Sequence, residues 1–256
     1  MLDALSALIL GLVEGFTEFL PISSTAHLNL ASNLLGLGQT GYVKTFEIAI
    51  QSGAIFAVVA LYAKKFLNLE VLKRIIVAFI PTGIVGFLFY KLIKTYLIGN
   101  TAVALSALAL GGLFLILFEK WHKEPVASQD ITIFDYRKSF IIGIFQSVAV
   151  IPGVSRAAAT IVGGMLMGIR REVIVEFSFL LAVPTMLAAT GFDVAQNINL
   201  FSSSEIGLLA LGFVASFATA IVSIKFLLAY IARHTFTAFG WYRIAVVLAF
   251  GVGYIF

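Results

Sequence analysis

The sequence predicts an all-α polytopic membrane protein made of two inverted-topology repeats, each a re-entrant helical hairpin followed by three transmembrane helices. Composition is the first of three observations behind this prediction: 61% of the 256 residues are hydrophobic and 12% are charged, against about 25% charged in soluble domains. The apolar runs are also continuous and of helix length, whereas membrane β-barrels alternate apolar and polar residues. Finally, short broken apolar segments occur at corresponding places in the two halves, a pattern typical of inverted repeats.

The first hairpin is expected within residues 1–40. The apolar segments on either side of Pro21 are each shorter than the roughly 20 residues that cross a bilayer. Pro21 lacks a backbone donor and ends the first helix, and Ser23 or Ser24 can cap the second. Non-helical backbone at membrane depth needs cover from protein or water, so we expect the tip at 20–24 to line a cavity.

The remaining segments complete one integral membrane domain, 1–256. The first repeat, 1–118, contains three full crossings, predicted at about 43–63, 73–93 and 101–118. A polar segment, 119–138, connects the halves on the cytoplasmic side. The second repeat, 139–256, starts with another broken pair and continues with three crossings, predicted at 139–151, 153–169, 172–191, 206–230 and 239–256.

The two halves match in the order and spacing of their motifs. Gly143-Ile-Phe-Gln146 corresponds to Gly11-Leu-Val-Glu14, and the segment from Pro152 corresponds to the segment from Pro21. Three crossings in each half is an odd number, so the second half is inverted relative to the first. Half-length helices at corresponding places indicate a binding site near the middle of the membrane.

Basic residues predict the orientation. Placing the loops 64–74, 119–138, 170–172 and 231–238 in the cytoplasm satisfies the positive-inside rule. These loops carry Lys64, Lys65, Lys73, Arg74, Lys120, Lys123, Arg137, Lys138, Arg170, Arg171 and Arg233, against Lys44, Lys91 and Lys94 on the other side. The first hairpin then enters from outside and the second from the cytoplasm, with their tips facing each other.

Polar side chains are concentrated between Glu14 and His27. Glu14 and Glu18 are four residues apart, so a helix places both on one face. Two such carboxylates repel unless a proton or a cation lies between them, and oxygen ligands suit magnesium or calcium. Ser24 and His27 are neighbours in the first turn of the next helix, whose free N–H groups favour an anion. The alternative is a solvated interfacial helix with ordinary cap residues.

Arg156 lies in the second tip among apolar and small residues. An arginine in this place requires an anion, and its planar fork suits two-point contact with phosphate. Gly153 allows close backbone approach, and Ser155 and Thr160 add hydroxyl donors. The alternatives are that Arg156 extends to the interface or pairs structurally with Glu18, and the pairing would also bring the tips together.

Glu47 and Gln51 are four residues apart near the start of the first full crossing. We expect both to support the first tip from behind the residues that touch the substrate. The alternative for each is an ordinary interfacial polar residue.

Taken together, the chain resembles the bacterial undecaprenyl-diphosphate phosphatases, the bacitracin-resistance protein family, over essentially its whole length. The resemblance implies an inner-membrane enzyme that removes the terminal phosphate of undecaprenyl diphosphate, recycles the lipid carrier for peptidoglycan synthesis and gives bacitracin resistance. Ala157-Ala158 stands where the family usually has Ser-Gly, which argues against a required hydroxyl at 157. The motifs that carry the resemblance are Glu14-x-x-x-Glu18, Pro21-x-Ser-Ser-Thr-x-His27 and Pro152-Gly-x-Ser-Arg156-x-x-x-Thr160.

The resemblance assigns catalytic roles to Glu18, Ser24, His27 and Arg156. We expect a divalent cation, Mg²⁺ or Ca²⁺, held by Glu14 and Glu18, to neutralise phosphate charge together with Arg156. Ser24 is the candidate nucleophile and His27 its base, while a phospho-histidine or direct attack by water are alternatives. The expected phosphate-binding residues are Ser23, Thr25, Gly153, Ser155, Arg156 and Thr160.

Three other classes of protein share features with this sequence. A transporter or flippase for the prenyl phosphate carrier would use the same midplane site. The type 2 phosphatidic acid phosphatase fold needs a second histidine shortly after its Ser-Arg, but the histidines here are His27, His122 and His234. A structural or channel protein would leave the acids and Arg156 unexplained. The expected partners are a prenyl diphosphate lipid and the bacterial inner membrane, crossed several times, with no nucleic acid; a homodimer is compatible with the sequence.

Overall fold

The computed structural model describes residues 2–38, 40–125, 130–132, 134–197 and 205–255, with side chains through residue 251 in the last range. Within the predicted connecting segment 119–138, residues 126–129 and 133 lie outside the described residues, as does Phe256 in the last predicted crossing.

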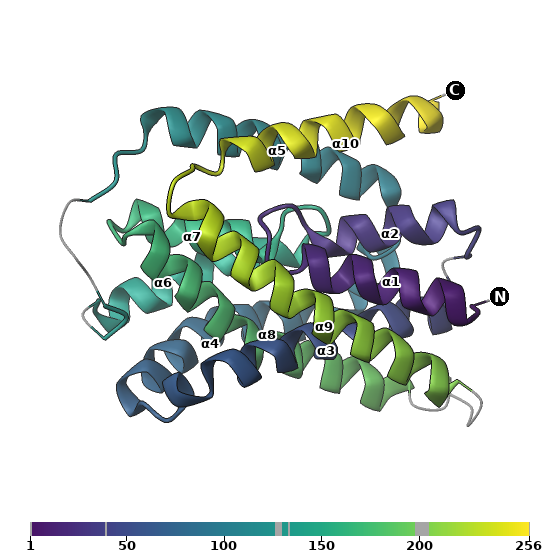
Figure 1. Ribbon diagram of the computed structural model, residues 1–256, viewed down its shortest axis with the longest axis horizontal. Coiled ribbons are helices and arrows are strands. Elements are labelled where there is room, and N and C mark those ends of the chain that lie inside the picture. Colours follow the sequence, from purple (N-terminus) through teal and green to yellow (C-terminus); the bar gives the residue numbers. More distant parts are fainter. Residues whose placement is uncertain (1, 39, 126–129, 133, 198–204, 256) are drawn as a thin grey trace.

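Every regular element in the described ranges is a helix (Figure 1). A five-residue π turn, η1 (Ile93–Leu97), extends α4, and a 3₁₀ turn, η2 (Val148–Val150), follows α6. The α-helices are α1 (Ala4–Thr17), α2 (Ser24–Leu34), α3 (Gly41–Phe66), α4 (Leu69–Leu92), α5 (Thr101–Trp121), α6 (Tyr136–Ser147), α7 (Arg156–Leu166), α8 (Arg171–Asn197), α9 (Ile206–Ile231) and α10 (Thr237–Ile255).

Five helices, α3, α4 with η1, α5, α8 and α9, are long and apolar enough to cross a membrane by length and composition. They coincide with five of the six predicted crossings, each with somewhat different ends. The sixth, α10, is apolar over Thr237–Gly251 but shorter than the other five over that range. The all-helical architecture of a multi-pass membrane protein is therefore confirmed.

The two predicted hairpins are present as the helix pairs α1–α2 and α6–α7, which lie toward opposite ends of the molecule (Figure 1). Their first helices pack on corresponding partners, because α1 contacts α9 and α6 contacts α4. Glycines permit the close approach: a Cβ at Gly15 would meet the Thr219 hydroxyl and the Ser216 carbonyl, and one at Gly143 would meet the Ala78 carbonyl.

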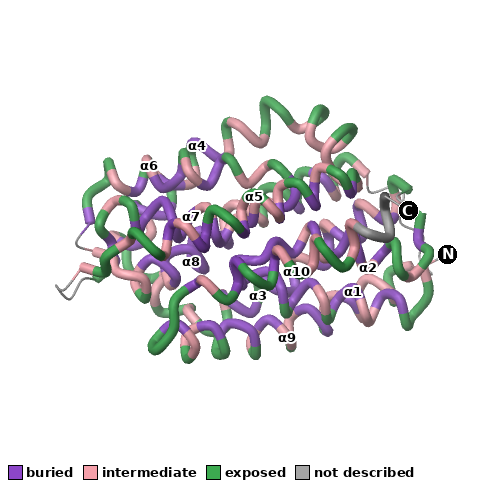
Figure 2. Tube along the Cα trace, turned by 90° about the horizontal axis from the view of Figure 1, so that it is seen from above, coloured by how far each residue is buried: buried purple, intermediate pink, exposed green. Residues whose placement is uncertain are grey.

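An apolar core surrounds the place where the hairpins meet (Figure 2). Phe19, next to the first tip, packs edge-on against Phe179 of α8 with ring centroids 5.3 Å apart. Phe134 makes a similar contact with Phe177 at 5.1 Å. These rings are fully or almost fully buried, and the Phe19–Phe179 contact anchors the backbone next to the first tip against α8.

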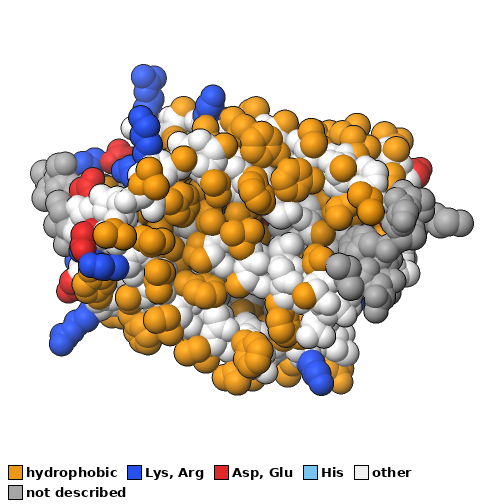
Figure 3. All heavy atoms as spheres, turned by 90° about the horizontal axis from the view of Figure 1, so that it is seen from below, with side chains coloured by type: hydrophobic (Ala, Val, Ile, Leu, Met, Phe, Trp, Pro, Cys, Tyr) orange, Lys and Arg blue, Asp and Glu red, His pale blue; other side chains and the backbone are white. Residues whose placement is uncertain are grey.

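Charged side chains are unevenly distributed over the surface. In Figure 3 lysine and arginine side chains lie mainly toward one end, while hydrophobic atoms cover much of the face between the ends. Ion pairs join elements at that charged end: Arg171 bonds Glu119 at 2.9 Å and Lys65 bonds Glu176 at 3.0 Å. An apolar girdle with charges beyond it is the surface expected for a chain that lies in a bilayer.

Candidate active site

The two hairpin tips share an unusual backbone conformation. Ser23 has φ 70° and Ser155 has φ 76°, and in the described part of the chain no other non-glycine residue has a positive φ. Each serine directly precedes a helix, α2 or α7. Residues held in this region of backbone space cost free energy and are concentrated at functional sites. The tips also touch, because the Gly153 N–H donates to the Ser23 hydroxyl at 3.1 Å.

A chain of short polar contacts connects the tips. The Arg156 guanidinium lies 2.7 Å from one oxygen of Glu18 and also donates to the Ser178 carbonyl at 2.7 Å. The Ser24 hydroxyl donates to the other oxygen of Glu18 at 2.5 Å. Glu18 thus orients both the arginine and the hydroxyl, and the pairing of Arg156 with Glu18, given above as an alternative to phosphate contact, is present. An ionised acceptor polarises the Ser24 O–H bond.

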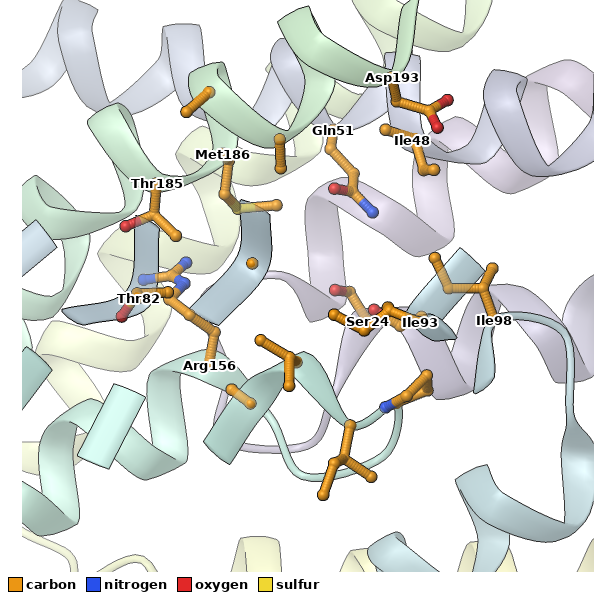
Figure 4. Close-up of a pocket in the computed structure, with 18 of the residues that line it drawn as sticks. Ser24, Ile48, Gln51, Thr82, Ile93, Ile98, Arg156, Thr185, Met186 and Asp193 are labelled. Carbon is orange, nitrogen blue, oxygen red and sulfur yellow. The ribbon is translucent and has the colours of Figure 1, made fainter. Parts of the chain in front are cut away.

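A cavity of about 440 Å³ opens beside this chain of contacts (Figure 4). Its remaining wall is largely apolar and comes mainly from α4, α8 and the segment 149–152. A pocket that joins a polar end to an apolar wall suits a ligand with a charged head and a hydrocarbon tail. The predicted site residues that line it are Glu18, Ser23, Ser24, Thr25, Glu47, Gln51, Gly153, Ser155 and Arg156.

Glu14 lies behind the cavity and is not part of its described lining. Its side chain is fully buried, and neither carboxylate oxygen has a hydrogen-bond partner among the described residues. An ionised carboxylate is costly in such a place unless a proton or a cation accompanies it. Glu14 and Glu18, one helical turn apart, therefore fit the oxygen-rich ligands that Mg²⁺ or Ca²⁺ prefers. The described chain offers no cluster of three or more acidic or imidazole groups for a metal, so water or ligand oxygens would complete the shell.

His27 does not line the cavity either. Its Nδ1 lies 2.8 Å from the Ser23 carbonyl, and its Nε2 lies 2.9 Å from the Tyr242 hydroxyl. Because a carbonyl only accepts, Nδ1 donates to the Ser23 carbonyl, and Nε2 shares a hydrogen bond with the Tyr242 hydroxyl. Both ring nitrogens are thus engaged away from Ser24. The hydrogen-bond acceptor of Ser24 in the structure is Glu18.

Thr160, a predicted phosphate ligand, is fully buried outside the cavity. Its hydroxyl donates to the Arg156 carbonyl at 2.9 Å and lies 3.3 Å from Gln146. Ser155 does line the cavity, and its hydroxyl accepts the Ala158 N–H at 3.2 Å, which caps α7. The Ser155 side chain is therefore at the cavity surface, where a ligand can reach it. The Thr160 hydroxyl instead bonds the backbone of Arg156.

Glu47 and Gln51 both line the cavity on α3. Glu47 accepts the Ser32 hydroxyl at 2.5 Å, which ties α3 to α2 behind the first tip. Both residues were expected behind the residues that touch the substrate, whereas in the structure both reach the cavity surface, because α3 forms part of its wall.

Arg243 of α10 was not among the predicted site residues, although it contacts both tips. Its side chain is fully buried. Every hydrogen bond that its guanidinium donates goes to a backbone carbonyl. Arg243 therefore holds segments of backbone together, as a clamp, and forms no ion pair among the described residues. The acceptors are Pro21 at 3.4 Å, Gly153 at 2.6 Å, Val154 at 3.2 Å, Ala107 at 3.1 Å and Leu108 at 3.2 Å. Its position in an apolar segment was the available signal, since a charged residue there marks a site.

Known proteins are similar to this chain over nearly its whole length. The sequence profile of a family described as "Bacitracin resistance protein BacA" matches residues 7–249. An undecaprenyl-diphosphatase of Aquifex aeolicus is 50% identical over 251 residues, which are 98% of both chains. The undecaprenyl-diphosphatase of Sulfurihydrogenibium sp. is 52% identical over 256 residues, 99% of this chain and 100% of its own, and that of Wolinella succinogenes is 45% identical over 251 residues, 97% of both chains.

Proposed function

The chain belongs to the bacitracin resistance protein family, and on this basis we propose that it is an undecaprenyl-diphosphatase. It hydrolyses undecaprenyl diphosphate to undecaprenyl phosphate and inorganic phosphate. One structural observation supports this reaction most directly. The contacts Arg156–Glu18–Ser24 lie at the polar end of a largely apolar cavity. The comparisons give no support to the flippase alternative.

The cellular role follows from this reaction. Regenerating the monophosphate carrier recycles it for peptidoglycan synthesis and protects the cell from bacitracin. We place the protein in the bacterial inner membrane, with the loops that carry most of the lysine and arginine in the cytoplasm. A homodimer stays a prediction.

Ser24 is positioned to attack the terminal phosphorus. In the proposed step the Ser24 oxygen forms a bond to that phosphorus, the bond to the bridging oxygen breaks, and undecaprenyl phosphate leaves. The Ser24 proton passes to Glu18, which already accepts the hydroxyl. Water then hydrolyses the phospho-serine. Arg156 and the backbone N–H groups at the start of α2 stabilise the negative charge on the phosphoryl oxygens, and His27 supports the tip from outside the cavity.

The charges around the cavity favour a divalent cation as a further component. Glu18, Glu47 and Asp193 line it against Arg156 and Lys94, so the protein alone supplies no excess of positive charge for a diphosphate. Glu14 and Glu18 would hold the cation. When bound, it neutralises phosphate oxygens and lowers the repulsion that these carboxylates exert on the headgroup.

Two inverted repeats, 1–118 and 139–256, account for the way the site is built. The packing of α1 on α9 corresponds to that of α6 on α4, and the packing of α3 on α9 corresponds to that of α8 on α4. Ser23 and Ser155 occupy equivalent places with nearly equal φ. A two-fold relation of this kind brings the tips together from opposite sides of the membrane, as in many proteins with midplane sites.

The proposal is tested by phosphate release from a C15 or C55 prenyl diphosphate in detergent, with EDTA and then with added Mg²⁺ or Ca²⁺. We expect release that depends on the metal and falls by about a hundredfold or more in Glu18→Ala. Glu172→Ala, which removes an exposed acid of the Arg170 ion pair, is the control and keeps wild-type turnover. Tight lipid binding by folded protein without phosphate release would contradict the hydrolase, while full activity in EDTA would contradict only the metal.

The apolar wall predicts where the prenyl tail lies. Gly86 on α4 lines the cavity, and a Cβ built there meets nothing within 4 Å. The Cβ of Gly86→Leu therefore enters open space, and the longer side chain takes up volume at the cavity wall. We expect an increase of about tenfold in KM for the C55 substrate and a smaller change for C15, at an unchanged melting temperature.

Gly191→Leu on α8 is the matched control, because this glycine is equally open but exposed and outside the cavity lining. Equal kinetic effects of the two substitutions would place the tail elsewhere.

A further inference from the structure

A second polar cluster lines the cavity and takes no part in the proposed reaction. The Lys94 ammonium lies 2.5 Å from Asp193 Oδ1, and the Tyr90 hydroxyl donates to the same oxygen at 2.7 Å. The three side chains come from η1, α8 and α4, and all line the cavity. In the view of Figure 4, Asp193 and Arg156 lie on opposite sides of the cavity, with Gln51 between them.

The pairing at this cluster is incomplete. Only 2% of the Asp193 side chain is exposed, and its Oδ2 has no partner among the described residues, although Oδ1 accepts two donors. Lys94 retains 18% side-chain exposure and its further contact, with the Thr45 hydroxyl, is long at 3.4 Å. The ammonium can therefore accept another anionic partner without leaving its place.

The backbone that carries Lys94 is irregular. It belongs to the π turn Ile93–Leu97, in which the α-helical bonding of α4 gives way just before the chain turns toward α5. Such turns are rare and are found frequently at functional sites. They also place a side chain where a regular helix would not. Lys94 lies at the end that the charge distribution assigns to the outer side, where released phosphate would meet water.

We propose that Lys94 and Tyr90 form a second phosphate-binding position in the cavity, and that Asp193 limits its affinity by competing for Lys94. This inference rests on the proposed function, because hydrolysis supplies both possible ligands, released inorganic phosphate and a phosphate of the lipid headgroup. A lone buried ammonium would retain the doubly charged product. The carboxylate beside it weakens that hold, so the product can leave.

The test is product inhibition by inorganic phosphate in Asp193→Asn, Lys94→Gln and the double variant. Asn keeps an acceptor for Tyr90 and removes the charge, so we expect the inhibition constant to fall by about tenfold in Asp193→Asn. In Lys94→Gln the constant is expected to rise, and the double variant should resemble Lys94→Gln because the competing carboxylate acts through Lys94. Lys91→Gln, an exposed lysine of the same helix outside the cavity lining, is the control.

The KM for the lipid diphosphate, measured on the same proteins, separates the two sources. A change confined to the inhibition constant assigns the position to released phosphate, and a parallel change in KM assigns it to the headgroup. Inhibition constants that stay at the wild-type value in Asp193→Asn and Lys94→Gln would overturn the inference while leaving the hydrolase intact.

A binding measurement keeps the two proposals distinguishable. Inorganic phosphate should raise the melting temperature of the wild type and of Arg156→Ala, and in the Arg156→Ala background this increase should be lost when Lys94→Gln is added. If the wild type released no phosphate but showed this Lys94-dependent shift, the proposed function would fail and the second position would stand. No shift in any protein, alongside normal turnover with unaltered inhibition constants, contradicts the position itself.

Discussion

Arg156→Ala is expected to reduce phosphate release by about a thousandfold or more, the largest effect of any single substitution at this site. The guanidinium is held at both sides, by Glu18 at 2.7 Å and by the Ser178 carbonyl at 2.7 Å. It needs no rearrangement to meet a phosphoryl group beside Ser24. Its removal takes away the positive charge that shares Glu18 with the proposed nucleophile and leaves Glu18 without its ion-pair partner.

Breaking a buried ion pair by removing one member can cost about 3–5 kcal/mol of unfolding free energy, so a conservative variant is needed. Arg156→Lys keeps the charge but not the planar fork, and one ammonium cannot reproduce contacts to Glu18, Ser178 and a phosphate together. We expect stability close to the wild type and a loss of about a hundredfold in kcat. Arg233→Ala, at an exposed arginine, is the control, and wild-type kcat in folded Arg156→Lys would contradict the role of the fork.

Arg243→Met is expected to lower kcat by about a hundredfold, since a displacement of about 1 Å caused by a distant substitution can have this effect. The side chain makes five bonds to carbonyls, three of them in the two tips. Without it, Pro21 and Gly153 lose the donor that holds them in one arrangement. Methionine also removes a buried charge that is costly in itself, so the change in unfolding free energy is smaller than the loss of five bonds suggests.

Measurements of kcat, KM and melting temperature on Arg243→Met and Arg243→Lys separate positioning from simple stability. Lysine can donate three bonds, so it should restore part of kcat. Gly111→Ala attacks the clamp from the other side, because a Cβ there would meet the guanidinium of Arg243, and it should lower kcat in the same way. Lys225→Met, at an exposed cation in α9, is the control. A lower melting temperature with unchanged kcat of the folded protein would reduce Arg243 to a structural role.

Local patterns were sufficient for the helices and for the tips. Continuous apolar runs, interrupted at Pro21 and Pro152, predicted short helices where the structure has α1, α2, α6 and α7. The length of an apolar run and the position of a proline determine where a helix ends, and both can be seen within a short stretch of sequence. The positive φ of Ser23 and Ser155 lay beyond such reasoning, because serine seldom adopts it and the surrounding tertiary contacts impose it.

The sequence also predicted that polar residues in apolar surroundings belong to a site, but it did not predict which of them line the cavity. Glu18 and Arg156 were predicted at the site and line the cavity. His27 and Thr160 were predicted with them, and the structure turns both toward supporting contacts. Spacing along a helix places a residue on a face. It does not say whether that face meets the cavity or the neighbouring helix.

The membrane class, the broken helices and the family's polar motifs follow from the sequence alone, because each depends on residues close together in the chain. Which polar groups meet depends on the tertiary fold. Arg243 reaches both tips from α10, and Lys94 reaches Asp193 from η1. Such contacts depend on how helices distant in sequence cross and how closely their glycines let them approach. That information is distributed over the whole packed molecule rather than held in any one segment.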